Sequence, residues 1–270
     1  MDSAAWNPRQ YLMFGDARLR PGHELLARGG DLVGELAPGP VYELGCGTGA
    51  HARAMAARWP ERPVTAIDHS PAMLDIAGTP PIPTNLFFIE ADIAGWSAPR
   101  RAALIFSNAT LHWLPDHRTL FTHLMGELVP GGVLAVQMPD NFKEPSHRLI
   151  RELALAPPWR DKLGTLTEPG GPLCDDLVAA PDFYYDTLAP LASGGIDLWR
   201  TEYLTALEGE RPVLEWIKGS ILRPVLARLE ADERPDFEDA LAARLAAAYP
   251  RRGDGTTLLP FRRLFFVATR

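Results

Sequence analysis

The stretch VYELGCGTGA, residues 41–50, contains the feature that decides the fold: a short apolar segment followed by three closely spaced glycines. Gly45, Gly47 and Gly49 stand at every second position after a strand-like segment, and a helix-like segment follows them directly. Such a turn allows a ligand to approach the backbone, and the N–H groups at the helix start can bind it. The stretch therefore predicts a ligand site at a strand-to-helix turn.

Outward from this turn, the chain alternates between strand-like and helix-like segments as far as Pro139. Apolar residues run together in the former and recur at helical spacing in the latter. This alternation predicts right-handed βαβ units and an open parallel sheet covered by helices. The predicted strands are residues 40–44, 63–68, 85–92, 103–108 and 133–138, and the predicted helices are 23–36, 51–59, 70–77 and 116–129.

Beyond Pro139 the regular alternation ends, and helix-like segments dominate. We expect a long loop at 157–175, because its glycines and prolines leave no helical or strand pattern. Two further strand-like segments bring the predicted number of strands to seven. The helix-like segments are 144–155, 181–191 and 210–249, and the strands are 196–207 and 261–269.

These elements predict one α/β domain over residues 1–270 with a Rossmann-like sheet. The helix-like residues between the sixth and seventh strands form a predicted helical cap over 209–260. The segment 1–22 precedes the core, and we expect it to act as a lid that excludes water from the ligand.

Composition limits the partners of the chain. Its 270 residues carry a formal net charge of −7, which argues against non-specific nucleic-acid binding. A run of about 18 apolar residues, as a membrane span requires, is absent. The first ten residues lack the apolar core of a secretory signal. Cys46 and Cys174 have neither metal-site nor disulfide spacing, so we expect a cytoplasmic protein without a metal.

Three classes of ligand compete for the glycine turn. A P-loop requires a lysine after its last glycine, and none follows Gly49. A dinucleotide site requires GxGxxG, whereas this turn reads GxGxG. The third candidate is S-adenosylmethionine, whose amino acid portion and ribose would lie over the turn.

Acidic residues at three strand ends favour the third candidate. Asp68 ends the second predicted strand, where a carboxylate can accept both ribose hydroxyls, although NAD enzymes share this feature. Glu43 precedes the turn, where an acid suits a ligand with a cationic ammonium and suits a pyrophosphate poorly. Asp92 follows the third strand and could reach an adenine amino group.

The segments VYELGCGTG, VTAIDHSPAML, FIEADI and SNATLHWLPD resemble the successive motifs of class I S-adenosylmethionine-dependent methyltransferases. This resemblance implies a seven-stranded sheet whose last strand is antiparallel. Cys46, within the turn, is expected to be a small filler rather than a reactive thiol. The implied cofactor contacts are Glu43, Gly45, Gly47, Asp68, His69, Met73, Asp92, Ile93 and Asn108. From the predicted lid, Tyr11 and Arg20 would reach the methionine carboxylate or the substrate.

Most of the chain also resembles the trans-aconitate 2-methyltransferase family. The segments that carry this resemblance are WNPRQYLMFGDARLRP, MPDNFKEPSH, FYYDTLAP, DLWRTEYLTAL and LRPVLARL. The resemblance implies monomethyl esterification of a tricarboxylate, with S-adenosylhomocysteine as co-product. The chain departs from the family at 218–221, where we expect a Thr-Gly pair, and in the linker 157–182. These departures leave the identity of the acid open.

The chemistry of such a reaction requires positioning rather than a general base. A carboxylate is already ionised at neutral pH, so no catalytic base is expected. Arginine suits a carboxylate substrate because its planar guanidinium donates paired, charge-assisted hydrogen bonds. Only one of the adjacent pair Arg262 and Arg263 can face a site from a strand. The predicted substrate residues are Arg223, Arg200, Arg263, Tyr184, Tyr185, Trp216 and His112.

Two other functions remain open at this point. A methyltransferase of a hydroxyl or amine acceptor would need a base, and His112 could supply it. A catalytically silent cofactor-binding protein would keep the glycine turn and lose turnover. For either, the expected partner is a small molecule, and the protein is a monomer or a small homo-oligomer.

Overall fold

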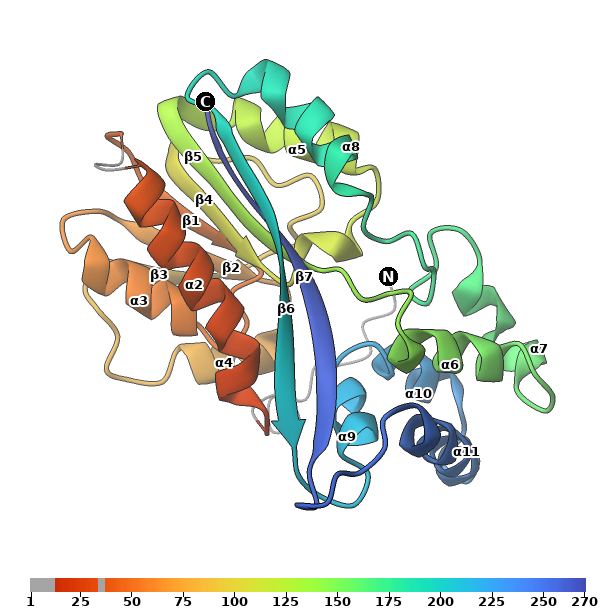
Figure 1. Cartoon of the computed structure of the whole chain (residues 1–270). Coiled ribbons are helices and arrows are strands. Elements are labelled where there is room, and N and C mark those ends of the chain that lie inside the picture. Colours follow the sequence, from red (N-terminus) through yellow and green to blue (C-terminus); the bar gives the residue numbers. More distant parts are fainter. Residues whose placement is uncertain (1–12, 34–36) are drawn as a thin grey trace. The chain divides into compact units, whose positions relative to one another are not determined.

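A seven-stranded sheet forms the framework of the protein. The structure, a computed structural model, describes residues 13–33 and 37–270. The sheet has the strand order β3-β2-β1-β4-β5-β7-β6 (Figure 1). The strands are β1 (Val41–Leu44), β2 (Val64–Asp68), β3 (Leu86–Glu90), β4 (Ala102–Asn108), β5 (Leu128–Pro139), β6 (Ile196–Leu207) and β7 (Thr257–Thr269).

Most helices begin and end where the sequence predicts. Several have proline in their first turn, where its missing N–H costs no hydrogen bond. The α-helices are α2 (Gly15–Val33), α3 (Ala50–Arg58), α4 (Pro71–Ala77), α5 (His117–Gly126), α6 (Pro145–Ala154), α7 (Arg160–Leu163), α8 (Pro181–Leu188), α9 (Pro212–Lys218), α10 (Arg223–Arg228) and α11 (Glu233–Ala248). The short 3-10 helices are η1 (Leu111–Trp113), η2 (Gly164–Thr167) and η3 (Ala189–Leu191).

Several segments differ from the sequence prediction. Strand β5 begins at Leu128, within the predicted helix 116–129, and the predicted helical segment 210–249 divides into α9, α10 and α11. Helix α2 begins at Gly15 rather than at His23, and it continues through Pro21. The prediction therefore began this helix too late. The segment 157–175, predicted as a loop, contains α7 and η2. These elements have only four residues each, too few to show a periodic pattern.

The chain divides into two compact units. The sheet unit comprises Gly15–Met138, Ala179–Thr201 and Leu264–Arg270. The helical unit comprises Pro139–Val178, Glu202–Arg263 and the described residues up to Phe14. The long strands β6 and β7 contribute residues to each unit.

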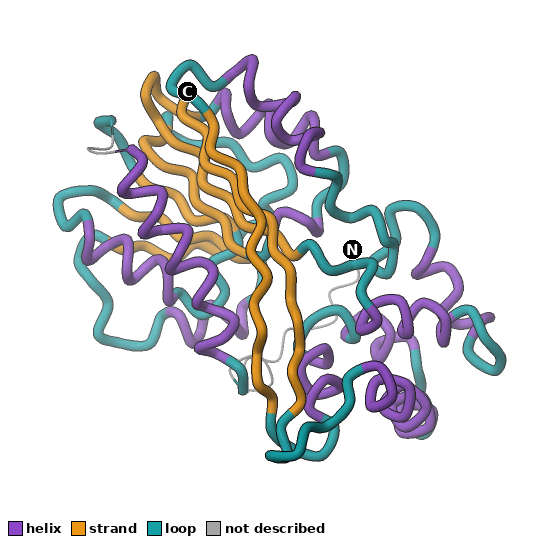
Figure 2. Tube along the Cα trace, in the orientation of Figure 1, coloured by secondary structure: helices purple, strands orange, loops and turns teal. Residues whose placement is uncertain are grey.

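In the sheet unit, the first five strands are parallel. The last strand, β7, runs antiparallel to β5. Two hydrogen bonds show this pairing: Gly131 N–H donates to Arg270 O, and Arg270 N–H donates to Gly132 O. Helices α2 and α3 cover one face of the sheet, and α5 and α8 cover the other (Figures 1 and 2). Every residue of β4 is buried, as expected for a strand covered on both faces.

The helical unit consists mainly of α6, α7 and the three helices between β6 and β7 (Figure 2). Helix α11 packs against α6 and α9. The hydroxyl of Tyr249 accepts a hydrogen bond from Ser146 N–H at 2.9 Å, and Trp159 contacts Phe237 edge to face. The hydrogen bond ties the residue after α11 to the start of α6, and the ring contact covers Phe237, one of the buried apolar residues of α11.

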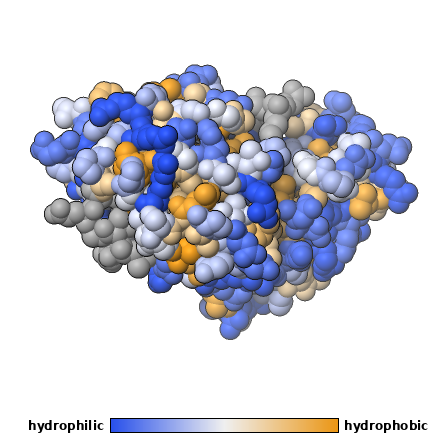
Figure 3. Space-filling view, turned by 90° about the horizontal axis from the view of Figure 1, so that it is seen from above, coloured by the Kyte–Doolittle hydropathy of each residue, from blue (hydrophilic) through white to orange (hydrophobic). Residues whose placement is uncertain are grey.

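Some large apolar side chains of the described residues are exposed, among them Phe87, Ile89 and Leu204. Within the described ranges, no helix combines the length and apolar character that crossing a membrane requires. On the face shown in Figure 3, apolar side chains occur in small groups among hydrophilic ones.

Candidate functional site

The glycine turn follows β1 as predicted, and each glycine has a different reason to be there. Gly45, Gly47 and Gly49 all have positive φ, the region that glycine adopts without strain. A Cβ on Gly45 would lie 2.2 Å from the Thr110 side chain, and one on Gly49 would lie 2.8 Å from Phe88. A Cβ on Gly47 would meet nothing within 4 Å. Gly47 therefore faces open space, as a position approached by a ligand requires.

Asp68 at the end of β2 is fixed over this turn. Its Oδ2 accepts a hydrogen bond from Gly47 N–H at 2.8 Å, and its Oδ1 accepts one from Ser70 N–H at 2.9 Å. A carboxylate has about four acceptor positions, so two remain for ligand hydroxyls. The side chain is thus oriented before any ligand arrives.

Glu43 is buried in β1 beside a histidine that the sequence analysis did not select. Its side chain is 1% exposed, and its Oε1 lies 3.6 Å from His51 Nδ1. Burial raises the pKa of the Glu43 carboxyl, and the hydrogen bond and charge of His51 oppose that rise. The second carboxylate oxygen, Oε2, has no hydrogen-bond partner among the described residues.

A second unsatisfied acceptor lies on the same face of the sheet. Glu43 is the partner of Phe106 in the parallel pair of β1 and β4, and Asn108 follows two residues later. Residues two apart on a strand share a face, so Glu43 and Asn108 point to the same side. Asn108 Oδ1 is buried without a hydrogen-bond partner in the described part of the chain. Buried acceptors are seldom left unsatisfied, and these two suit a cationic ammonium.

The remaining predicted cofactor residues of the sheet unit follow β1, β2 and β3. Met73 in α4 is buried, whereas His69 and Asp92 are exposed and Ile93 is half-buried. Asp92 Oδ1 accepts a hydrogen bond from Ala94 N–H at 2.9 Å. The Cys46 thiol is buried, and its pKa is raised by burial and by the charges of Glu43 and Asp68. It therefore stays a neutral thiol.

The two predicted lid residues have different positions. Tyr11 lies outside the described residues. Arg20 lies within helix α2 rather than in a separate segment, and its Nε pairs with Glu24 Oε1 at 2.6 Å. Both side chains are largely exposed, so this pair is weak.

The sheet unit contains four of the predicted substrate residues. Tyr184 is fully buried; its hydroxyl lies 2.7 Å from His117 Nδ1, and its ring stacks on Phe266. This position gives Tyr184 a packing role and leaves it no exposed surface for a substrate. His112 in η1 is buried beside Trp113. The other two, Tyr185 and Arg200, are exposed.

The helical unit contains the other three. Trp216 is 2% exposed, and its ring contacts Phe14 and Phe261. The Arg263 guanidinium lies over the Phe261 ring, 4.5 Å from its centroid, and the side chain is buried. Burial lowers the pKa of Arg223 to about 10, which leaves this half-buried guanidinium protonated at neutral pH. Two arginines with little exposure thus belong to this unit.

Arg262, the neighbour of Arg263, has a structural partner. Its Nη2 lies 2.5 Å from Glu144 Oε1, at the start of α6. Adjacent strand residues point in opposite directions, so Arg263 faces the other side of the strand from this ion pair.

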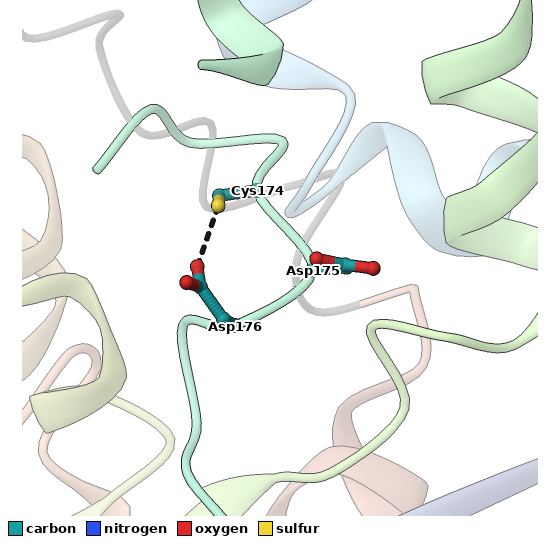
Figure 4. A group of neighbouring side chains, drawn as sticks. All are labelled: Cys174, Asp175 and Asp176. Atoms are coloured by element: carbon teal, nitrogen blue, oxygen red, sulfur yellow. Dashed lines mark hydrogen bonds between the residues drawn. The ribbon is translucent and has the colours of Figure 1, made fainter. Parts of the chain in front are cut away.

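A small acidic group lies in the linker before α8. Cys174 Sγ lies 2.5 Å from Asp176 Oδ1, and these two side chains point toward each other (Figure 4). A carboxylate oxygen of Asp175 lies within 4.8 Å of these two atoms, and both aspartates are exposed. Exposed carboxylates of this kind are ordinarily solvated.

Known proteins resemble this chain over its whole length. A family model described as "Methyltransferase domain" matches residues 41–132. The trans-aconitate 2-methyltransferase of Rhodopseudomonas palustris strain BisA53 is 43% identical over 267 residues, which are 99% of this chain and 100% of that one. The protein of the same name from Methylobacterium radiotolerans is 44% identical and covers 99% of both chains.

Solved structures share the fold at low sequence identity. The YcgJ protein from Bacillus subtilis has a TM-score of 0.55 at 13% identity and covers 92% of this chain and 98% of its own. A phosphoethanolamine N-methyltransferase 2 from Haemonchus contortus has a TM-score of 0.51 at 15% identity. The match covers 93% of this chain and 52% of that one. These structures show the fold alone. The curated relatives, which are more than 40% identical from end to end, show that the chain belongs to the trans-aconitate 2-methyltransferase family.

Proposed function

We propose that the protein transfers a methyl group from S-adenosylmethionine to a carboxylate of trans-aconitate or a close polycarboxylate. The products are a monomethyl ester and S-adenosylhomocysteine. The observation that carries this proposal is the full-length identity of more than 40% to relatives named for this reaction. The buried acceptors and the open glycine turn of the sheet unit support it independently.

The sheet unit has a residue for each part of the cofactor. Gly47 leaves room over the turn, Asp68 accepts the ribose hydroxyls, and Glu43 with Asn108 accepts the ammonium. Met73 packs against the adenine. When bound, S-adenosylmethionine supplies a methyl group activated by a sulfonium cation.

The helical unit has residues suited to a polyanionic acid. Arg223 and Arg263 are both little exposed, so their hydrogen bonds to a carboxylate meet little competition from water. Their guanidinium groups can hold a carboxylate in a fixed orientation by paired donors. Orientation of this kind can contribute about 7–11 kcal/mol to lowering a barrier. The residues therefore act by positioning, because the acceptor oxygen is already anionic.

A panel of acceptors tests the proposal. The purified protein with S-adenosylmethionine is incubated with di- and tricarboxylates, and separately with phenol and amine acceptors that lack carboxylates. We expect product only with polycarboxylates, and most of it with trans-aconitate. Methylation confined to the phenols or amines would instead support a hydroxyl or amine methyltransferase with His112 as base.

A further inference from the structure

His51 lies in the sheet unit between three elements that surround the cofactor turn. Its Nδ1 faces Glu43 of β1, its Nε2 lies 3.1 Å from the carbonyl oxygen of Leu19 in α2, and its ring contacts Phe106 of β4. The side chain is 4% exposed. A Cβ on Gly22 would lie 2.3 Å from the ring, so only glycine lets α2 approach this closely. The imidazole is thus held in one place.

The protonation of this pair follows from its geometry. A carbonyl oxygen only accepts hydrogen bonds, so Nε2 carries a proton and donates it to Leu19 O. Nδ1 faces a carboxylate oxygen, and a lone pair there would be repelled. At the 3.6 Å between Nδ1 and Glu43 Oε1, the pair is therefore favoured when it holds one further proton. This proton resides either on the ring, which leaves Glu43 an anion, or on Glu43, which leaves it neutral.

Neighbouring charges favour the ring as the site of this proton. Burial alone would lower the pKa of His51, but the hydrogen bond and charge of Glu43 outweigh burial and raise it. The pKa of His23, whose ring is 4.8 Å away on α2, is lowered by burial and by the charge of His51. Asp68 on β2 raises the pKa of Glu43 and so opposes this preference, and the Cys46 thiol is neutral. A protonated His51 therefore lies beside the Glu43 carboxylate and beside a neutral histidine, His23.

We propose that His51 is a positioning residue of the cofactor site: it takes up the proton that burial would otherwise place on Glu43, and so keeps Glu43 a carboxylate. The unpartnered oxygen Oε2 of Glu43 then remains an anionic acceptor for the ammonium of the ligand. This inference rests on the proposed function, because it takes the ligand to be an S-adenosyl amino acid. His51 acts through Glu43 and does not touch the ligand in this account.

Two ligands separate the role of the ammonium from the rest of the site. S-adenosylhomocysteine has the ammonium, whereas 5′-methylthioadenosine keeps the adenosine and the thioether but lacks the amino acid portion. In His51→Gln, His51 no longer opposes the burial that raises the pKa of Glu43, so the neutral form of Glu43 is favoured. We expect S-adenosylhomocysteine to bind between about tenfold and 100-fold more weakly to this variant at neutral pH. Binding of 5′-methylthioadenosine should change less than about threefold.

The pH dependence gives the sharper readout. In the wild type His51 keeps Glu43 a carboxylate, so affinity for S-adenosylhomocysteine should change little with pH near neutrality. In His51→Gln, binding requires the ionised Glu43, whose pKa is raised. The affinity of this variant for S-adenosylhomocysteine should be highest above the pKa of Glu43 and should fall by about tenfold per pH unit below it. His117→Gln is the matched control. Like His51, His117 lies between a side-chain oxygen, the Tyr184 hydroxyl, and a backbone carbonyl oxygen, that of Leu111.

Isothermal titration calorimetry on the full-length proteins provides these affinities, and ¹⁵N NMR of the wild type provides a test that needs no variant. The inference expects both ring nitrogens of His51 to be protonated near pH 7. A neutral His51 in that spectrum, or a His51→Gln variant with the wild-type affinity and pH profile, would overturn it while leaving the proposed function intact. Failure of the wild type to bind S-adenosylhomocysteine at all would overturn the proposed function, and this inference with it.

Discussion

At the scale of single residues, the burial of charged groups separates functional positions from structural ones. Arg263 and Arg223 are both shielded from water, whereas Arg200 and Arg20 are exposed and Arg262 is paired with Glu144. Hydrogen bonds from shielded arginines to a substrate carboxylate meet little competition from water. We therefore propose Arg223 and Arg263 for the substrate contacts.

The first prediction concerns Arg223. Arg223→Ala should lower kcat/KM for trans-aconitate by about 100-fold, because a charge-assisted hydrogen bond to the substrate is lost. Affinity for S-adenosylhomocysteine should be unchanged, because its proposed contacts belong to the sheet unit. Steady-state kinetics and calorimetry measure the two effects.

The matched control for Arg223 is Arg228→Ala, an exposed arginine in the same helix α10. It should retain wild-type kinetics. An Arg223→Ala variant with wild-type kinetics, beside a His112→Ala variant without turnover, would contradict the carboxylate mechanism and favour a base-dependent acceptor.

The second prediction concerns acid stability. Burial lowers the pKa of His147 to about 3, with a smaller contribution from the charge of Arg151. A histidine in the unfolded chain titrates near its ordinary value of about 6.5. Below that pH the unfolded state binds the proton and the folded state does not. This residue alone should therefore lower the free energy of unfolding by about 1 kcal/mol per pH unit between those two values.

Urea unfolding from pH 7 to pH 4 checks this. The His147→Gln variant, which cannot titrate, should show a shallower loss of stability toward acid than the wild type. Equal slopes in the two proteins would mean that His147 is protonated in the folded state.

At the scale of elements, the glycine turn shows how much of the site the sequence predicts. The turn, the strand ends at Asp68 and Asn108, and the order of strands and helices all follow from local pattern, because glycines and periodicity are local signals. The identity of the residue that pairs with Glu43 does not follow from local pattern. His51 is eight residues later in α3, and only the packing of α3 on β1 brings it to the carboxylate.

Tertiary packing also explains why some residues have surroundings that differ from those predicted from the sequence. Tyr184 occurs in an aromatic segment that suits a substrate wall, yet α8 turns it into the core beside His117 and Phe266. For the adjacent pair Arg262 and Arg263, the sequence predicts only that the two side chains point in opposite directions. The ion pair with Glu144 selects Arg262 as the structural one.

The third prediction uses two glycines of the turn. Gly45→Ala should destabilise the protein by about 2–4 kcal/mol, because its Cβ would overlap Thr110 and its φ is positive. Gly47→Ala meets no protein atom and should cost only about 1–2 kcal/mol of strain. Its methyl group would occupy the space proposed for the ligand.

Gly47→Ala should therefore lower affinity for S-adenosylhomocysteine more than it lowers stability. Thermal unfolding and calorimetry of both variants measure the two effects. A Gly47→Ala variant with unchanged affinity would show that the ligand does not approach the turn at this position.

At the scale of the whole molecule, the division into two units parallels a division of chemical roles. The sheet unit carries the acceptors that suit an ammonium and ribose, and the helical unit carries shielded arginines that suit a polycarboxylate. The shared fold alone does not specify an acceptor, since one fold serves many reactions. The helical unit, together with the identity to curated relatives over the entire chain, is what points to an acid substrate.

The most direct test of this account is the product formed from trans-aconitate. The full-length protein is incubated with trans-aconitate and S-adenosylmethionine carrying a deuterated methyl group, with the trimethyl ester of trans-aconitate as the blocked control. Mass spectrometry should detect one labelled methyl ester per acid molecule, in equal amount with S-adenosylhomocysteine, and no labelling of the blocked control. Absence of labelled ester with trans-aconitate and with every other polycarboxylate, from a protein that binds S-adenosylmethionine, would contradict the central claim.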